Sequence, residues 1–236
     1  MKLKGQYLHP GKITPKEECE MFGLMSKYFG NVSLDQFRED LYEKDYIILL
    51  KSIDNGKVAG FSTQKVFYSL LGKEKVTVVY SGDTIIDRRY WGTRILPDVF
   101  WQLTREIKKA QEDYRIFWML ISKGVRTYRF LPVFYRVFYP NYKSNTPTVY
   151  KEFMDRIGYE IFPHRYNPHI GIIVSSGEHQ YLKEAFHPPR NRNRNPHEVF
   201  FYENNPGFIK GDELLCITEL ELDNIHPHLQ KHFSML

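Results

Sequence analysis

The sequence predicts a mixed α/β fold in which a mostly antiparallel, twisted sheet is flanked by helices. Residues 46–52, 57–70 and 76–86 are apolar, partly alternating segments joined by short turns, as expected of an antiparallel meander. Asn55-Gly56 in the first turn favours the positive φ angles of a tight hairpin. Apolar residues then recur at helical spacing over 95–111. The chain is therefore expected to change from sheet to helix after the third meander strand.

Two helices are expected before the meander. Thr14 followed by Pro is typical of a helix start, because a threonine side chain accepts from first-turn N–H groups and Pro suits the first helical position. This predicts a helix over 15–29. Ser33 is the corresponding cap of a second helix over 34–43, and residues 5–9 form a short strand ahead of both.

The remainder of the chain is expected to complete one domain. A fourth apolar strand over 116–121 leads to a helix over 127–138, in which Pro132 predicts a kink or a new first turn. We expect an acyltransferase-like core over 1–150 and a C-terminal extension over 151–236 that packs on it and completes the sheet. In that extension we expect helices over 147–156, 178–186 and 197–203, a strand over 213–222 and a tail over 229–236.

Composition limits the class of protein. The 33 basic and 28 acidic residues give a net charge of +5, a small excess that favours anionic partners but is also typical of a solvated surface. Cys19 and Cys216 cannot make a disulfide framework, which fits a reducing cytoplasm. No apolar run approaches the roughly 18 residues that a membrane span needs. We therefore expect a soluble, cytoplasmic protein.

One stretch carries a family resemblance. Residues 84–96 read apolar strand, turn, then helix. Aligned without gaps with the pattern x-x-x-Tyr-Arg-Gly-x-Gly-Ile-Gly, residues 87–96 match it at Tyr90, Gly92 and Ile95. This stretch, and the order of elements around it, resemble the GNAT (GCN5-related N-acetyltransferase) superfamily, as a divergent bacterial-type member. The resemblance covers roughly residues 5–140.

The resemblance implies a donor site for coenzyme A. In the family, backbone N–H groups of this turn and of the helix start face the pyrophosphate of the cofactor, as helix N-termini generally favour anions. The donor would be a coenzyme A thioester, acetyl-CoA or a longer acyl-CoA, as co-substrate. The cofactor-binding residues implied are Ile85, Ile86, Arg88, Arg89, Trp91, Gly92, Thr93 and Arg94.

This sequence departs from the family pattern at the turn. Trp91 stands at the basic or glutamine position, and Arg94 and Leu96 replace two of the three glycines. Side chains with a Cβ crowd a phosphate cradle. Arg88 and Arg89, together with Arg94, place three cations at the helix entrance, where they could bind phosphate by side chain instead. A solvated basic turn is the alternative interpretation.

Two side chains are candidates for the chemistry. The resemblance implies that Tyr135 protonates the departing thiolate, with Tyr128 and Tyr139 as competing tyrosines or core residues. An amine nucleophile must also lose a proton, and Asp83 on the donor-facing strand can accept it directly or through water. Gly82 predicts a bulge or a close ligand approach beside it. The alternative for Asp83 is a turn cap or a solvent-facing carboxylate.

Two further clusters have weaker predictions. Three arginines alternate with asparagines in the 187–197 loop, which suits a phosphate, an acidic carrier protein or nucleic acid, or a solvated loop. Three histidines lie near the C-terminus without an acidic or cysteine partner at ligand spacing, so no metal site is predicted. These residues are Arg190, Arg192, Arg194, His226, His228 and His232.

Two functions follow from these expectations. The first is an enzyme that moves an acyl group from a thioester, coenzyme A or acyl carrier protein, to a small-molecule amine. The aromatic content, 16% of residues, and the bulky Trp91 would suit a longer or more apolar acyl group than acetyl. The alternative is a non-catalytic GNAT-like binding module, with a basic surface for nucleic acid, the less favoured partner, or an acidic protein.

Overall fold

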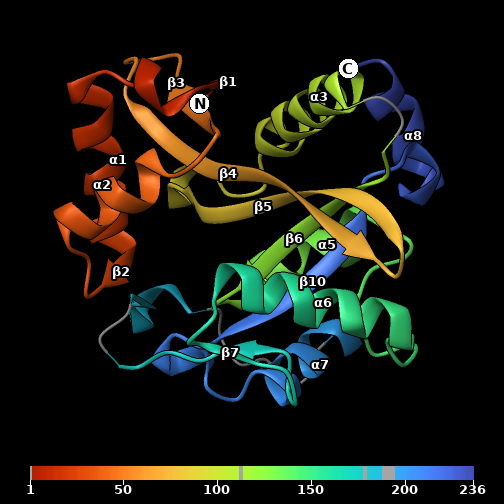
Figure 1. The fold of residues 1–236 in the computed structure, drawn as a ribbon. Coiled ribbons are helices and arrows are strands. Elements are labelled where there is room, and N and C mark those ends of the chain that lie inside the picture. Colours follow the sequence, from red (N-terminus) through yellow and green to blue (C-terminus); the bar gives the residue numbers. More distant parts are fainter. Residues whose placement is uncertain (1, 112–113, 178–179, 188–194) are drawn as a thin grey trace.

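The computed structural model describes residues 2–111, 114–177, 180–187 and 195–236. Its main feature is an eight-stranded sheet in the order β1-β3-β4-β5-β6-β10-β8-β7 (Figure 1). Every neighbouring pair is antiparallel except β5 and β6, which run parallel. The predicted fold class, a mostly antiparallel sheet flanked by helices and completed by the C-terminal part, is confirmed. The strands of this sheet are β1 (Leu3–Leu8), β3 (Tyr46–Ser52), β4 (Val58–Leu71), β5 (Glu74–Ile86), β6 (Ile116–Ser122), β7 (Tyr166–Asn167), β8 (Ile172–Ile173) and β10 (Glu213–Glu219).

The meander is buried on both faces. Successive side chains of a strand point to opposite faces, so β3 supplies two separate cores. Ile47 and Leu49 pack with helices α1 (Pro15–Tyr28) and α2 (Leu34–Tyr42), whereas Ile48 and Leu50 pack with α3 (Ile95–Ala110). The predicted helix starts are present, since Thr14 and Glu17 form a reciprocal capping box at α1.

Helices cover both faces of the sheet. One face carries α1 and α2 over the first strands and α6 (Thr148–Ile161) over β5, β6 and β10 (Figure 1). The other face carries α3, the short helices α4 (Val125–Tyr128) and α5 (Phe130–Phe134), α7 (Pro196–Asn204) and α8 (Pro227–Ser234). No helix in the described ranges has the length and apolar character needed to cross a membrane.

The helix predicted over 127–138 is wrong in extent. The chain forms α4 and α5 instead, with Pro132 inside the second, and ends at Phe134. Tyr135 is already extended, with φ −114° and ψ 142°, and it forms an isolated bridge with Ile225. The backbone therefore leaves the helical conformation at Tyr135 and pairs with the C-terminal segment. In this position the Tyr135 side chain lines a cavity on the α3 face of the sheet.

Other C-terminal predictions need correction. The helix predicted over 178–186 is a two-residue strand, β9 (Tyr181–Leu182), followed by a 3-10 turn; residues 178–179 lie outside the described residues. β9 pairs with β2 (Phe29–Gly30) in a separate small sheet. The predicted tail contains α8, and the predicted helix over 147–156 extends to Ile161. Arg190, Arg192 and Arg194 lie outside the described residues.

Candidate active site where β5 and β6 diverge

The parallel strands β5 and β6 separate after a short paired stretch. Their register runs from Thr77 opposite Ile116 to Ser81 opposite Leu120. Beyond Ser81, residues 84–86 keep partners in β4, and the described residues of β6 pair with none of them. The two strands therefore open a gap in the sheet at the carboxyl end of β5 (Figure 1).

A β-bulge lies at the start of this gap. Thr84 is opposite Ser62 and Ser81 is opposite Gln64, so β5 has one residue more than β4 between these pairs. A Cβ on Gly82 would lie 2.7 Å from the Thr63 hydroxyl oxygen, which leaves no space for a side chain there. The bulge predicted at Gly82 is confirmed.

The bulge places side chains on opposite faces of the sheet. Ser81 and Thr84 line an apolar cavity on the α3 face. Asp83, between them, lines a polar cavity on the face that carries α2 and α6. In a regular strand Ser81 and Thr84, three positions apart, would point to opposite faces, because side chains alternate along it. The two cavities thus meet at one short piece of β5.

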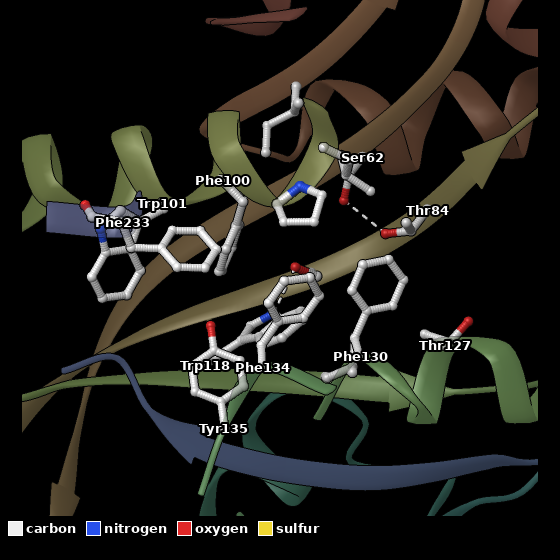
Figure 2. A pocket seen from close by; sticks show the side chains of 15 residues that line it. Ser62, Thr84, Phe100, Trp101, Trp118, Thr127, Phe130, Phe134, Tyr135 and Phe233 are labelled. Carbon is white, nitrogen blue, oxygen red and sulfur yellow. Dashed lines mark hydrogen bonds between the residues drawn. The ribbon is translucent and has the colours of Figure 1, made fainter. Parts of the chain in front are cut away.

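The cavity on the α3 face is small and aromatic, with a volume of about 40 Å³. Figure 2 shows rings from α3, α5, β6 and α8 around it, with the hydroxyls of Ser62 and Thr84 at one end. The residues that line it are Ile48, Ser62, Ser81, Thr84, Leu96, Pro97, Phe100, Trp101, Trp118, Leu120, Thr127, Phe130, Phe134, Tyr135 and Phe233.

A chain of buried polar side chains forms the floor of this cavity. Trp118 Nε1 donates to Ser81 Oγ at 2.8 Å, and Ser81 Oγ donates to Gln64 Oε1 at 2.6 Å. Gln64 Nε2 donates to Ser62 Oγ at 2.7 Å, and Ser62 Oγ lies 2.7 Å from Thr84 Oγ1. The hydroxyls of Ser62 and Thr84 carry one hydrogen each, and the hydrogen bond between them uses only one of the two. One hydroxyl hydrogen of this pair is therefore left to donate to a ligand.

Tyr135 is the candidate tyrosine that faces this cavity. Its ring packs against Trp118 at 5.9 Å between centroids, and burial raises the pKa of its hydroxyl. In Figure 2 the hydroxyl of Tyr135 points from the sheet side toward α3. Tyr128 instead donates to the Pro140 carbonyl at 3.2 Å, and Tyr139 lines a separate cavity beside Tyr150.

Asp83 lines a larger cavity of about 550 Å³ on the opposite face. Burial raises the pKa of its carboxyl to about 6, although the positive charge of Lys123 opposes this rise. A carboxylate with this pKa is ionised at neutral pH and is a much better proton acceptor than an ordinary aspartate. Other charged residues that line the cavity are Asp40, Glu43, Lys44, Lys65, Lys123, Glu160, Arg165 and Glu213.

The turn after β5 is held by Asp87. Its carboxylate accepts from Arg89 Nε at 2.9 Å and from Lys27 Nζ at 2.8 Å. Burial alone would raise the pKa of Asp87, but these hydrogen bonds lower it to about 2. Arg89 is thus engaged within the turn. Its predicted contact with a donor would compete with Asp87.

Trp91 and an arginine that the sequence did not single out close the outer end of the gap. Trp91 Nε1 donates to the Ile86 carbonyl at 2.8 Å, and the guanidinium carbon of Arg126 lies 3.8 Å from the Trp91 ring centroid. Burial, followed by the charge of Arg88, lowers the pKa of Arg126. The contact joins the turn after β5 to α4, so no local sequence pattern could reveal it.

Three arginines of the turn after β5 and of α4 have no carboxylate partner among the described residues. Within the described ranges, Arg88, Arg94 and Arg126 make no ion pair. Arg88 lies 5.8 Å from the Trp91 ring centroid on the same turn. Together they leave uncompensated positive charge around Trp91, where an anion would be favoured.

The first turn of α3 is poorly suited to bind that anion through its backbone. Gly92 has φ +84°, a conformation that favours glycine. Few of the backbone N–H groups that follow it are free to bind an anion. The N–H of Ile95 donates to Thr93 Oγ1 at 3.3 Å, and Pro97 has no N–H. Asp98 adds a negative charge to the same turn. Leu96 remains as the candidate backbone donor.

The predicted site residues thus lie in four places. Ile85, Ile86 and Trp91 line a mouth of about 120 Å³, which shares Thr84 and Thr127 with the aromatic cavity. Tyr135 lies inside that cavity and Asp83 lies on the other face. The residues of the turn that line neither the mouth nor these two cavities are Arg88, Arg89, Gly92, Thr93 and Arg94.

Comparisons with known proteins give structural likenesses alone. No family model matches the sequence, and no curated protein matches it. Among solved structures, a conserved protein from Enterococcus faecalis V583, described as a probable N-acyltransferase, is similar at TM-score 0.43 and 12% identity, over 58% of this chain and 33% of that one. The match therefore spans about a third of the Enterococcus protein.

Two further solved structures are similar in the same way. A GNAT family N-acetyltransferase from Escherichia coli in complex with CoA gives TM-score 0.38 and 15% identity, over 55% of this chain and 69% of that one. Glucosamine-6-phosphate N-acetyltransferase from Arabidopsis thaliana gives TM-score 0.36 and 14% identity, over 50% and 82%. At such identities and TM-scores these likenesses establish neither the family nor the activity of this chain.

Proposed function

We propose that the protein is an N-acyltransferase that moves an acyl group from a thioester to an amine. The thioester enters along the gap between β5 and β6 on the α3 face, and the amine enters from the cavity that contains Asp83. One observation carries this proposal: the β-bulge presents Thr84 to one cavity and Asp83 to the other, one residue apart.

In the proposed reaction Asp83 accepts a proton and Tyr135 donates one. The amine nitrogen attacks the thioester carbonyl carbon; a C–N bond forms and the C–S bond breaks. The amine proton passes to the Asp83 carboxylate, directly or through water, and later to solvent. The departing thiolate takes a proton from the Tyr135 hydroxyl, which regains one from solvent. The products are an amide and a thiol.

Asp83 has the proton affinity that this role needs. With a pKa of about 6, it is ionised near neutral pH, yet it binds a proton more readily than an aspartate in water. Tyr135 is protonated at neutral pH, as a tyrosine ordinarily is, and burial raises its pKa further. The pair therefore provides one base and one acid from opposite faces of the sheet.

The donor's phosphates would be held by side chains more than by backbone. The first turn of α3 lacks the N–H of Pro97 and carries Asp98, so it fits a pyrophosphate poorly. Within the described ranges Arg88, Arg94 and Arg126 make no ion pair, although Arg126 donates to the Phe186 carbonyl, and guanidinium groups bind phosphate oxygens well. We infer that a coenzyme A thioester is held by these arginines, with an acyl carrier protein as the alternative donor.

The first turn of α3, which has few free backbone N–H groups, favours a second candidate function. A GNAT-like binding module would keep the fold, bind no thioester, and use the basic surface around Trp91 for nucleic acid or an acidic protein. Its discriminating property is salt-dependent binding of RNA or DNA without stabilisation by coenzyme A.

Titration with coenzyme A and acyl-CoA separates the two candidates. Thermal unfolding is followed with each ligand up to millimolar concentration, and thiol release is measured with a panel of small amines. Stabilisation together with amine-dependent thiol release supports the enzyme. Absence of both, with acyl carrier protein also tested as donor, contradicts it.

A further inference from the structure

We propose that the aromatic cavity on the α3 face is an acyl-chain site that selects a short apolar acyl group of about three to five carbons over acetyl. This inference rests on the proposed acyltransferase function and names the substrate class of its donor. The cavity begins where the donor mouth ends, since Thr84 and Thr127 line both.

The polarity of the lining gives the acyl group a direction. Figure 2 shows Thr127, Thr84 and Ser62 at one end, and Trp101 and Phe233 at the other. The leftover hydroxyl hydrogen of the Ser62–Thr84 pair can donate to the acyl carbonyl oxygen. The hydrocarbon part then extends toward the aromatic end, where the lining is apolar apart from the Tyr135 hydroxyl.

The deep end of the cavity is closed by α8. Trp101 Nε1 donates to the Phe233 carbonyl at 2.9 Å, and the Phe233 ring packs against Trp101 at 5.4 Å. His232 Nε2 lies 2.8 Å from Asp98 Oδ1, which joins α8 to the first turns of α3. These contacts fix the end wall, so the cavity has a limited length.

The volume sets the chain length. A cavity of about 40 Å³ accommodates about three water-sized groups, since one such group needs roughly 10–15 Å³ on this measure. A methyl or methylene group has a similar size. Acetyl would leave this apolar space unfilled, whereas an octanoyl chain would exceed it. A propionyl, butyryl or branched five-carbon acyl group fits.

A chain-length series tests the proposal. Acetyl-, propionyl-, butyryl-, isovaleryl- and octanoyl-CoA are compared by thermal shift and by kcat/KM for thiol release with a single amine. One methylene in an apolar pocket is worth about tenfold or more in kcat/KM. We expect butyryl-CoA to exceed acetyl-CoA by at least about tenfold and octanoyl-CoA to be disfavoured. An optimum at acetyl or at octanoyl overturns the proposal.

The same series distinguishes this proposal from the proposed function. If no acyl-CoA of any length stabilises the protein or releases thiol, the acyltransferase function itself fails. If acyl-CoA esters react and acetyl is best, the function stands and the acyl-chain site fails.

A variant locates the selectivity in the cavity. Phe134 lines the cavity and is only partly buried, so Phe134→Ala enlarges it without emptying the core, and Phe134→Leu is the milder change. We expect the optimum to move to longer chains, with octanoyl-CoA gaining about tenfold relative to butyryl-CoA. The matched control is Phe22→Ala, which removes an equally large, partly buried ring packed against Phe37 beneath the other sheet face. An unchanged optimum in Phe134→Ala contradicts the proposal.

Discussion

Asp83 is the residue on which the proposed chemistry depends most. It sits on β5, and burial raises its pKa to about 6. Folding therefore favours its protonated form. The native state binds the extra proton between the usual pKa near 3.8 and the folded pKa near 6, so ionised Asp83 lowers stability as pH rises through that window. A destabilising charge retained in a cavity is typical of a functional site.

Replacing Asp83 should separate activity from stability. We expect Asp83→Asn to lower kcat by about 10²–10⁴-fold, since a positioned base contributes that much. It should unfold at the same or a higher temperature than the wild type at pH 7.5, because a partly buried, desolvated negative charge is removed. Steady-state kinetics and thermal unfolding check both. Unchanged kcat, or a clear loss of stability, is inconsistent with the role given to Asp83.

The pH dependence of the proposed reaction follows from the same group. The base form of Asp83 is lost as pH falls through about 6, so kcat/KM should decline about tenfold for each further pH unit. The profile is measured from pH 4.5 to 8 with a saturating donor. A decline centred near pH 4 would indicate that another group accepts the proton.

Tyr135 can be tested against a matched tyrosine. Tyr135→Phe removes the hydroxyl from the aromatic cavity, and we expect kcat to fall about 10²-fold while the donor Kd changes little. Tyr139→Phe is the control, because Tyr139 lies in a separate cavity. Equal activities of the two variants would show that the Tyr135 hydroxyl does not assist the leaving thiolate.

The elements around the site show what local sequence can predict. The meander, α1, α2 and α3 were predicted because each is specified by neighbouring residues, such as the Thr14 cap or the apolar period of α3. The bulge at Gly82 was predicted for the same reason, and so was the position of Asp83 on β5.

Other elements depend on distant partners. Strands β7 and β8 are two residues each and exist because β10 provides the hydrogen-bonding edge. The chain after Phe134 is extended because it pairs with residues near 217 and 225. Arg126 belongs to the site because it contacts Trp91, and this contact brings α4 against the turn after β5. Such features need the tertiary structure.

The first turn of α3 offers a prediction at the scale of an element. Pro97→Ala restores an N–H to the turn that would face the donor's phosphates, and a hydrogen bond to a charged group is worth about 1.5–3 kcal/mol. We expect the Kd for coenzyme A to decrease about tenfold, measured by calorimetric titration. Pro15→Ala, at the start of α1, is the control. A Kd that stays the same would mean that the phosphates lie away from this turn.

At the scale of the whole molecule, the site lies at a junction of layers. The gap between β5 and β6 opens to α3, α5 and α8 on one face and to α2 and α6 on the other. Lys27 on α1 and Arg89 both bind Asp87 in the turn after β5, which ties one helical layer to the donor mouth. Under the proposed function, donor and acceptor would therefore approach from different faces without sharing an entrance.

The Asp87 junction predicts a global effect on stability. Because its folded pKa is about 2, below the usual value, its contribution is complete above about pH 4 and is lost as pH falls toward 2. We expect Asp87→Asn to lower the free energy of unfolding by about 1–3 kcal/mol at neutral pH. Urea denaturation at pH 7 and pH 3 checks this. A variant as stable as the wild type at pH 7 would contradict it.

The most direct test of the donor site uses the tryptophans. The chain has three, and Trp91, Trp101 and Trp118 all line the donor mouth or the aromatic cavity. In a ¹H–¹⁵N spectrum their indole N–H signals report on this region alone. During titration with butyryl-CoA, we predict that the signals of Trp91 and Trp118 shift with one Kd below millimolar. Three indole signals that remain unmoved at millimolar ligand would contradict a thioester site between β5 and β6.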